Sequence, residues 1–236
     1  MKKIIITSVC ALAMAVSALG QGTVNWASIP FTAMTAQTNS TQTSPFPYGF
    51  SFNTFVGAQG ATASATSGSV FYYALLYKPY AGFQLATPTT VADLNTWQFS
   101  GLMATNSNIA GRLTPVAPNT AAIVPWGPGV TNSIVMLGWS ANMGSTWGAV
   151  SNLLNHPESD LTIGSEFIGA SATGYIAPGN ANPGSILFAN APTATGLAIS
   201  SPNTQLFLYV PIPEPGTLAL ASLGGAVVLM LRRRKK

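Results

Sequence analysis

Short apolar segments separated by turn residues constrain the fold of this chain more than any other feature. Residues 70–77 and 133–139 are apolar at almost every position, which is typical of strands buried on both faces. Residues 49–56 alternate aromatic and small side chains with a period of two, as a strand with one buried face does. Further segments of strand-like composition are 166–170, 185–188 and 204–210.

Pro- and Gly-rich turns separate these segments and predict a mainly β fold. Many short strands joined by such turns are typical of an antiparallel β-sandwich or a jelly-roll-like body. We expect one or two short helices within it. Residues 90–97 contain Thr90 and Asp93 in a capping-box arrangement, and residues 145–154 have apolar side chains at helical spacing. The Ser/Thr-rich segments 32–44 and 58–69 are expected to form mobile loops.

The first 20 residues are organised as a signal peptide. Two lysines precede an apolar run over residues 4–19, and the small residues Ala18 and Gly20 occupy the positions that signal peptidase reads. We therefore expect cleavage after Gly20. A retained anchor or a buried core helix is the alternative, but the apolar run is short for a membrane span and the residues after it are polar and strand-like. Cys10, the only cysteine, would leave with this segment, so the mature chain would have no disulfide and no thiolate.

The C-terminus combines a short apolar segment with a basic tail. Residues 217–231 carry no charge and lead directly into five cations: Arg232, Arg233, Arg234, Lys235 and Lys236. A helix of this length covers about 22 Å, against a hydrocarbon core of about 30 Å. We expect a C-terminal transmembrane helix nevertheless, because flanking Arg and Lys side chains can reach the headgroups and the bilayer can thin. The positive-inside rule places the tail in the cytoplasm and the body outside.

Pro213, Glu214 and Pro215 precede this apolar segment. The tripeptide, the short helix and the basic cluster together resemble the PEP-CTERM sorting signal of exopolysaccharide-producing, Gram-negative-type bacteria. The resemblance implies that an exosortase, a membrane transpeptidase, cleaves near the tripeptide and releases or transfers the body. Residues 21–26 resemble, more loosely, the start of such proteins of verrucomicrobial or planctomycete type.

These features divide the chain into three parts: a signal peptide (1–20), an exported β-rich domain (21–211) and a sorting signal (212–236). The whole chain has a formal net charge of +4, but residues 21–211 contain only two cations, Lys78 and Arg112, and four acidic residues. Because nucleic-acid binding needs a basic surface, nucleic acid is excluded as a partner of the domain. The sorting signal describes a route and leaves the activity of the domain open.

Side chains for catalysis or metal binding are few in the domain. The only histidine, His156, forms with Glu158, Asp160 and Glu166 the one concentration of titratable groups. A weak calcium loop is conceivable there, but the spacing matches no known calcium loop, so we favour a solvated loop and expect no metal and no other cofactor. Ser140 lacks the second glycine of a nucleophile elbow and is expected to end a strand.

We expect a non-enzymatic surface or extracellular-matrix protein, held at the inner membrane before processing and then displayed outside. An exopolysaccharide-binding module is the alternative, because sugars stack on exposed aromatic rings, although core packing explains most of the aromatic residues. A secreted hydrolase is a third possibility. Several Trp and Tyr side chains on one exposed face would favour the binding module. A cleft that joins His156 to an acid and a nucleophile would favour the hydrolase.

Overall fold

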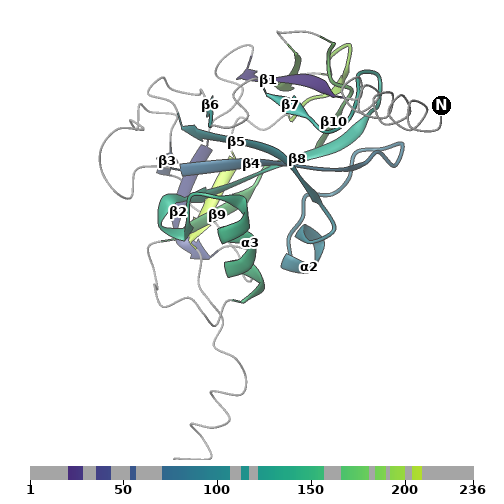
Figure 1. The fold of residues 1–236 in the computed structure, drawn as a ribbon. Coiled ribbons are helices and arrows are strands. Elements are labelled where there is room, and N and C mark those ends of the chain that lie inside the picture. Colours follow the sequence, from purple (N-terminus) through teal and green to yellow (C-terminus); the bar gives the residue numbers. More distant parts are fainter. Residues whose placement is uncertain are drawn as a thin grey trace, which may run out of the picture.

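The computed structural model describes residues 21–28, 36–43, 54–56, 71–106, 113–116, 122–156, 166–180, 184–189, 192–199 and 204–208. Within them the fold is mainly β, with two short α-helices, as predicted (Figure 1). The predicted signal peptide, the predicted loop 58–69 and the C-terminal segment 212–236 lie outside the described residues.

The strands form two sheets. The larger sheet has ten strands, eight of them in the order β3-β2-β13-β9-β8-β4-β5-β6, while β10 pairs with β8 and β12. Their bounds are β2 (Ala36–Thr43), β3 (Thr54–Val56), β4 (Phe71–Pro79), β5 (Gln98–Asn106), β6 (Leu113–Pro115), β8 (Asn132–Ser140), β9 (Phe167–Ala170), β10 (Gly174–Ile176), β12 (Gly196–Leu197) and β13 (Thr204–Leu208). The smaller sheet has the order β11-β1-β7, with β1 (Gly22–Ser28), β7 (Ile123–Val124) and β11 (Ser185–Phe188). The helical elements are α2 (Val91–Leu94), the 3₁₀ turn η1 (Ala141–Met143) and α3 (Trp147–Asn155).

The pairing of β4 with β8 is the centre of the larger sheet. The two strands are antiparallel and in continuous register over nine residue pairs, from Phe71 opposite Ser140 to Pro79 opposite Asn132. Every residue of β8 is buried. A strand buried on both faces has apolar side chains at odd and even positions alike, which explains the two uninterrupted apolar runs of the sequence.

The smaller sheet covers one face of this pair. Tyr73 and Leu75 of β4 and Ile134 and Met136 of β8 point into the same core cluster. The smaller sheet supplies Val24, Trp26, Val124, Leu187 and Phe188 to that cluster. Figure 1 shows β1 and β7 on one side of β4 and β8, and the helices on the other.

The helices cover the opposite face. Ala74 and Leu76 of β4, with Val135 and Leu137 of β8, form a second core cluster. The helical elements contribute Leu94, Met143, Val150 and Leu154 to it. Because successive side chains of a strand point to opposite faces, each central strand serves both clusters at once.

Most strand pairs are antiparallel, as predicted, but two are parallel. β1 pairs in parallel with β11, and β13 in parallel with β2. In each case most of the chain separates the two strands, so a long connection brings them side by side. The antiparallel sandwich of the prediction is therefore present only in part.

Some boundaries differ from the prediction. Residues 36–43, within a predicted loop, form β2, because pairing with β13 and β3 overrides a polar sequence with weak strand character. Helix α3 begins after Thr146 rather than at Ser145, since the backbone N–H of Ala149 donates to the Thr146 hydroxyl at 3.2 Å. The capping role of Thr90 is confirmed, because its hydroxyl accepts from the N–H of Asp93 at 3.1 Å.

Gly138 tests how closely β8 packs against its neighbours. A Cβ atom there would lie 2.8 Å from the Tyr73 ring and 2.9 Å from the side chain of Leu206. We expect Gly138→Ala to lower the free energy of unfolding by about 1–3 kcal/mol, because both neighbours belong to a filled core. Urea unfolding of the purified protein measures the change.

Gly148 provides the matched control. It lies in α3 with nothing within 4 Å of a Cβ atom, so Gly148→Ala should stabilise the protein by up to about 1 kcal/mol through helix propensity. If Gly138→Ala unfolds at the same urea concentration as the unmodified protein, that result would contradict the close packing of β8 against β4 and β13 at this position.

Candidate functional site

The residues that carry the sorting prediction lie outside the described part of the chain. These are the tripeptide 213–215, the apolar segment 217–231, the basic residues 232–236 and, at the other end, Ala18 and Gly20. The last described residue before them is Leu208, at the end of β13. Among the described helices, none is both long and apolar enough to cross a membrane.

The predicted titratable cluster is described only in part. His156 caps the C-terminus of α3, where it is exposed and its Nδ1 lies 3.0 Å from the carbonyl oxygen of Asn152. Glu158 and Asp160 lie outside the described residues. Glu166 is only 1% exposed, so the expectation of a solvated loop is wrong for this member. Within the described ranges, no three His, Cys, Asp or Glu side chains converge on a point that could hold a metal ion.

Ser140 has a structural role in the sheet. It is the last residue of β8, as predicted, and its hydroxyl accepts a hydrogen bond of 2.8 Å from the backbone N–H of Phe167 at the start of β9. The side chain is buried. A hydroxyl used in this way closes the β8–β9 ladder and does not face a cleft.

Ser171 and Thr173 organise one side of the molecule. In the sequence, Ser171 lacks the second glycine of a nucleophile elbow, and neither residue is predicted to have this structural role. The N–H of Ser171 donates to the carbonyl of Met136 at 2.8 Å, and the Ser171 hydroxyl accepts from the N–H of Met136 at 3.0 Å. This serine thereby bridges the interval between β9 and β10, which both pair with β8. Its signal in the sequence is only a small polar residue between two short strands.

The same interval fixes the segment that follows β4. The Gln84 side chain donates to the carbonyl of Thr173 at 2.6 Å, and the Thr87 hydroxyl donates to the carbonyl of Ser171 at 3.3 Å. The Thr173 hydroxyl in turn donates to the carbonyl of Leu85. Residues 84–87 are therefore held along the β9–β10 interval and form one wall of a cavity.

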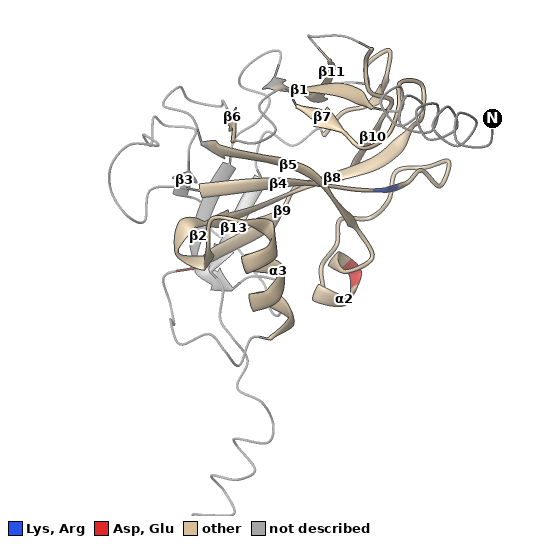
Figure 2. Ribbon diagram, viewed as in Figure 1, with Lys and Arg blue, Asp and Glu red and all other residues tan. Residues whose placement is uncertain are grey.

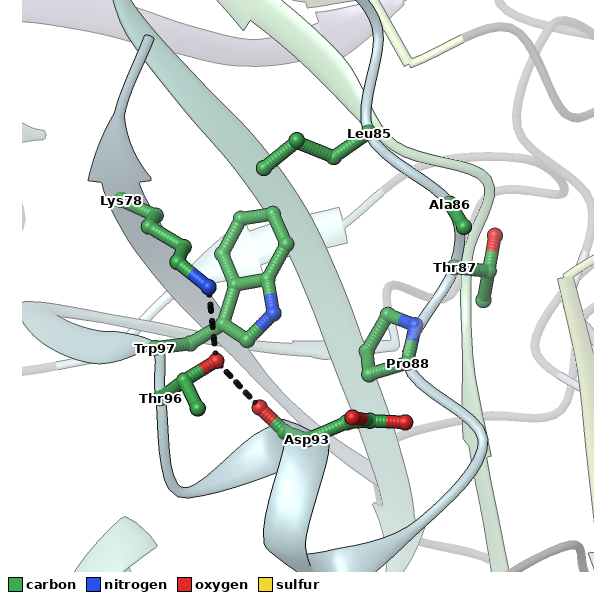
Figure 3. Close-up of a pocket in the computed structure, with 8 residues that line it drawn as sticks. All are labelled: Lys78, Leu85, Ala86, Thr87, Pro88, Asp93, Thr96 and Trp97. Carbon is green, nitrogen blue, oxygen red and sulfur yellow. Dashed lines mark hydrogen bonds between the residues drawn. The ribbon is translucent and has the colours of Figure 1, made fainter. Parts of the chain in front are cut away.

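This cavity has a volume of about 200 Å³. It is lined by Lys78, Leu85, Ala86, Thr87, Pro88, Asp93, Thr96 and Trp97 (Figure 3). The ammonium of Lys78 donates to the Thr96 hydroxyl at 2.9 Å, and that hydroxyl donates to the backbone carbonyl of Asp93 at 2.6 Å. The Lys78 nitrogen also lies 5.9 Å from the centre of the Trp97 ring, within cation–π range.

The cavity presents groups that can bind a small polar molecule. Lys78 is the only Lys or Arg in the described part of the chain, and Asp93 on α2 is one of two acidic residues there (Figure 2). The cavity thus offers one ammonium, one carboxylate and an apolar surface from Leu85 and Pro88. Its lining includes no histidine and no cysteine. Such a site can hold a small polar molecule.

The tryptophans lie mostly in the core. Trp26, Trp97, Trp126 and Trp139 are buried, and Trp147 packs against the helical cluster. This agrees with the interpretation of most aromatic side chains as core residues. In the described part of the chain, the tryptophans do not form the exposed face that sugar stacking would require.

Two tyrosines form a partly exposed pair. Tyr80, just after β4, and Tyr175 in β10 lie with ring centres 4.6 Å apart. Desolvation raises the pKa of Tyr80, and the charge and hydrogen bond of Tyr175 raise it further. The Tyr80 hydroxyl therefore favours its neutral form, and the ring contact links the start of the segment after β4 to β10.

Comparison with known families identifies the C-terminal segment. Residues 211–235 match the PEP-CTERM protein-sorting motif. The prediction of a PEP-CTERM signal at 212–236 is therefore confirmed, and with it the expectation of an exosortase substrate is supported. No curated protein and no solved structure matches the chain. The PEP-CTERM match covers the last 25 residues or so and does not extend into the sheets.

Tyr73 tests whether the buried aromatic groups serve packing alone. Its ring is fully buried, its hydroxyl has no hydrogen-bond partner among the described residues, and burial raises its pKa well above the usual value. Tyr73 loses its proton at about pH 10 in the unfolded chain but keeps it in the folded protein. The free energy of unfolding therefore falls as pH rises through that range. We expect Tyr73→Phe to raise the free energy of unfolding by about 1 kcal/mol at neutral pH and to reduce its alkaline decline.

Urea unfolding at neutral pH and at about pH 10.5 measures both effects. Tyr77→Phe serves as a control, because it removes a hydroxyl from the same strand at a partly exposed position. A Tyr73→Phe variant that is clearly less stable than the unmodified protein would show that the hydroxyl makes an essential bond.

Proposed function

We propose that this chain is an exported, non-enzymatic surface or extracellular-matrix protein whose C-terminus is processed by an exosortase-type enzyme. The match of residues 211–235 to the PEP-CTERM protein-sorting motif carries this proposal. A protein with this motif is expected to be anchored at the membrane before processing and to reach the cell surface or the matrix afterwards. The signal peptide (1–20), the span (217–231) and the topology set by residues 232–236 are the remaining parts of the proposal.

The tripeptide suits presentation to a membrane enzyme. Pro213 and Pro215 restrict the backbone on both sides of Glu214, and prolines in this spacing disfavour a helix that would hide the peptide bonds. The apolar segment that follows it is shorter than the hydrocarbon core of a bilayer. A segment of this kind is held at the membrane surface long enough to be cut, and the basic tail keeps its far end inside.

The absence of enzymatic activity is supported by where the reactive groups lie. In the described part of the chain, Ser140 closes a strand ladder and His156 is exposed at the end of α3. Lys78 is engaged with Thr96 and Trp97. The hydrolase alternative would need these groups to meet in one cleft, and their contacts assign them to separate structural roles.

The binding-module alternative has less support. Four of the five tryptophans are buried, so a stacking face for exopolysaccharide is not formed by them. The loose resemblance of residues 21–26 to verrucomicrobial or planctomycete-type proteins stays a prediction, since the matched motif says nothing of lineage.

Replacing Glu214 tests the sorting role. In a host that contains an exosortase, the unmodified protein should appear outside the membrane fraction without its tail. Glu214→Ala should remain full length in the membrane, because the enzyme loses the acidic centre of its recognition tripeptide. Antibody detection of the body and of a C-terminal epitope in both fractions measures the outcome.

Two controls make this result specific. Pro202→Ala changes a proline outside the matched motif and should leave release nearly unchanged. The unmodified protein in a host without an exosortase should stay in the membrane. If Glu214→Ala and the unmodified protein are released equally, the segment is an ordinary anchor and the proposed sorting is wrong.

A further inference from the structure

The last described strand fastens the C-terminal part of the chain inside the larger sheet. β13 pairs with β9 on one side, with Leu208 opposite Phe167, and with β2 on the other. The Leu206 side chain is fully buried in the core cluster beside Gly138. Because β13 is paired on both sides, its end is a fixed point on the surface of the body.

The sorting motif begins close to that fixed point. The matched segment starts at residue 211, three residues after Leu208, and Pro213 follows two residues later. An extended chain covers at most about 3.6 Å per residue, so Pro213 lies within about 18 Å of the end of β13. A domain of this size has a radius of gyration of about 16 Å. The tether is therefore no longer than the body is wide.

The end of β13 lies at the same edge of the sheet as the end of β8. Both strands are antiparallel to β9, and Trp139 and Phe207 are both paired with Ile168, so β8 and β13 end at the same edge of the sheet, on either side of β9. The turn η1 and residues 144–146 follow β8 at this end, and Ser145 is exposed there. At the opposite end, Val130 precedes β8 and is 53% exposed. The nine residues of β8 separate the two ends by about 30 Å.

We propose that, before processing, the body rests against the lipid surface with the end that carries η1 and residues 144–146, and points the Val130 end away from it. This orientation rests on the proposed function, because it requires the segment after Pro215 to lie in the membrane. It goes further in assigning one end of the sheet as the surface that meets lipid headgroups.

The distribution of charge agrees with this orientation. The described residues from Ala141 to Ala149 carry no charge. Glu166, which precedes β9 at this same end, is only 1% exposed. Lys78, which is paired with Ser133 near the start of β8, lies at the far end of the sheet, and Asp93 lines the same cavity. An end with no exposed charge among its described residues approaches headgroups without desolvating a solvated ion, which would be costly.

The opposite orientation strains the tether. The predicted span starts at Thr217, nine residues after Leu208, so the connection reaches about 32 Å at most. To place Val130 on the lipid, this connection would have to run back along nearly the whole length of β8. The short tether therefore keeps the η1 end closer to the bilayer than the Val130 end.

Two single-cysteine variants of the exported chain, from which residues 1–20 have been removed, test the proposal. Cys10 leaves with that segment, so an introduced thiol is the sole labelling site. Ser145→Cys and Val130→Cys, each labelled with the same fluorophore, are reconstituted without an exosortase into phosphatidylcholine vesicles that carry a headgroup quencher. We expect severalfold stronger quenching at residue 145 than at residue 130.

A spacer provides the matched control. An insertion of about ten Gly and Ser residues after Val210 lengthens the tether and should remove most of the difference between the two labels. Equal quenching without the spacer, or stronger quenching at residue 130, would overturn the orientation.

The two proposals fail in different ways. A chain that does not float with the vesicles would overturn membrane anchoring, and the orientation with it. A chain that floats but shows equal quenching would overturn the orientation alone and leave the sorting role in place.

Discussion

The antiparallel pairing of β4 with β8 is the interaction on which the rest of the structure depends. It joins two strands that are apolar on both faces, so one ladder supports two cores. The smaller sheet packs on one face and the helical elements on the other. Gly138 leaves space on β8 for Tyr73 and for Leu206 of β13, and so the same pairing fixes the strand from which the sorting segment leaves. A body with few charges and no cysteine after the predicted cleavage depends on such packing for its stability.

The packing and hydrogen-bonding roles of the aromatic and hydroxyl side chains bear on function. The tryptophans would be the strongest candidates for sugar stacking, but they pack in the two cores, and Trp97 also contacts Lys78. The hydroxyls of Ser140, Ser171 and Thr173 satisfy backbone groups between strands and along segment 84–87. The described part of the chain is thus a packed scaffold with a small polar cavity around Lys78, and its best-supported functional signal lies beyond the sheets, in the motif at residues 211–235.

Local patterns predicted the parts of the fold that depend on local sequence. Strands buried on both faces, such as β4 and β8, stand out as unbroken apolar runs, and β11 was predicted at its observed bounds. β2 was missed because its polar sequence becomes a strand only through pairing with the distant β13. β5 was missed because Gly101, with φ +80°, interrupts it at a bulge where the Ser100 hydroxyl bonds to the carbonyl of Leu75.

The same contrast holds for the candidate sites. The sorting motif is linear, so the order of tripeptide, apolar segment and basic tail was sufficient to predict it. The cavity around Lys78 was not predictable, because α2 supplies Asp93 and the turn after α2 supplies Trp97. Hydrogen bonds with Ser171 and Thr173 position its other wall. Neither set of contacts leaves a spacing that could be recognised in the sequence.

The most direct test measures the intact mass and the two terminal residues of the protein recovered outside the cells of its native host. It shows whether a removable signal peptide and a removable sorting signal flank a stable β body. The expected product begins at Gln21 or within a few residues of it and ends close to the tripeptide 213–215, with β13 retained. An external protein that still carries residues 217–236 would contradict C-terminal processing, and one that still carries the first 20 residues would contradict the signal peptide.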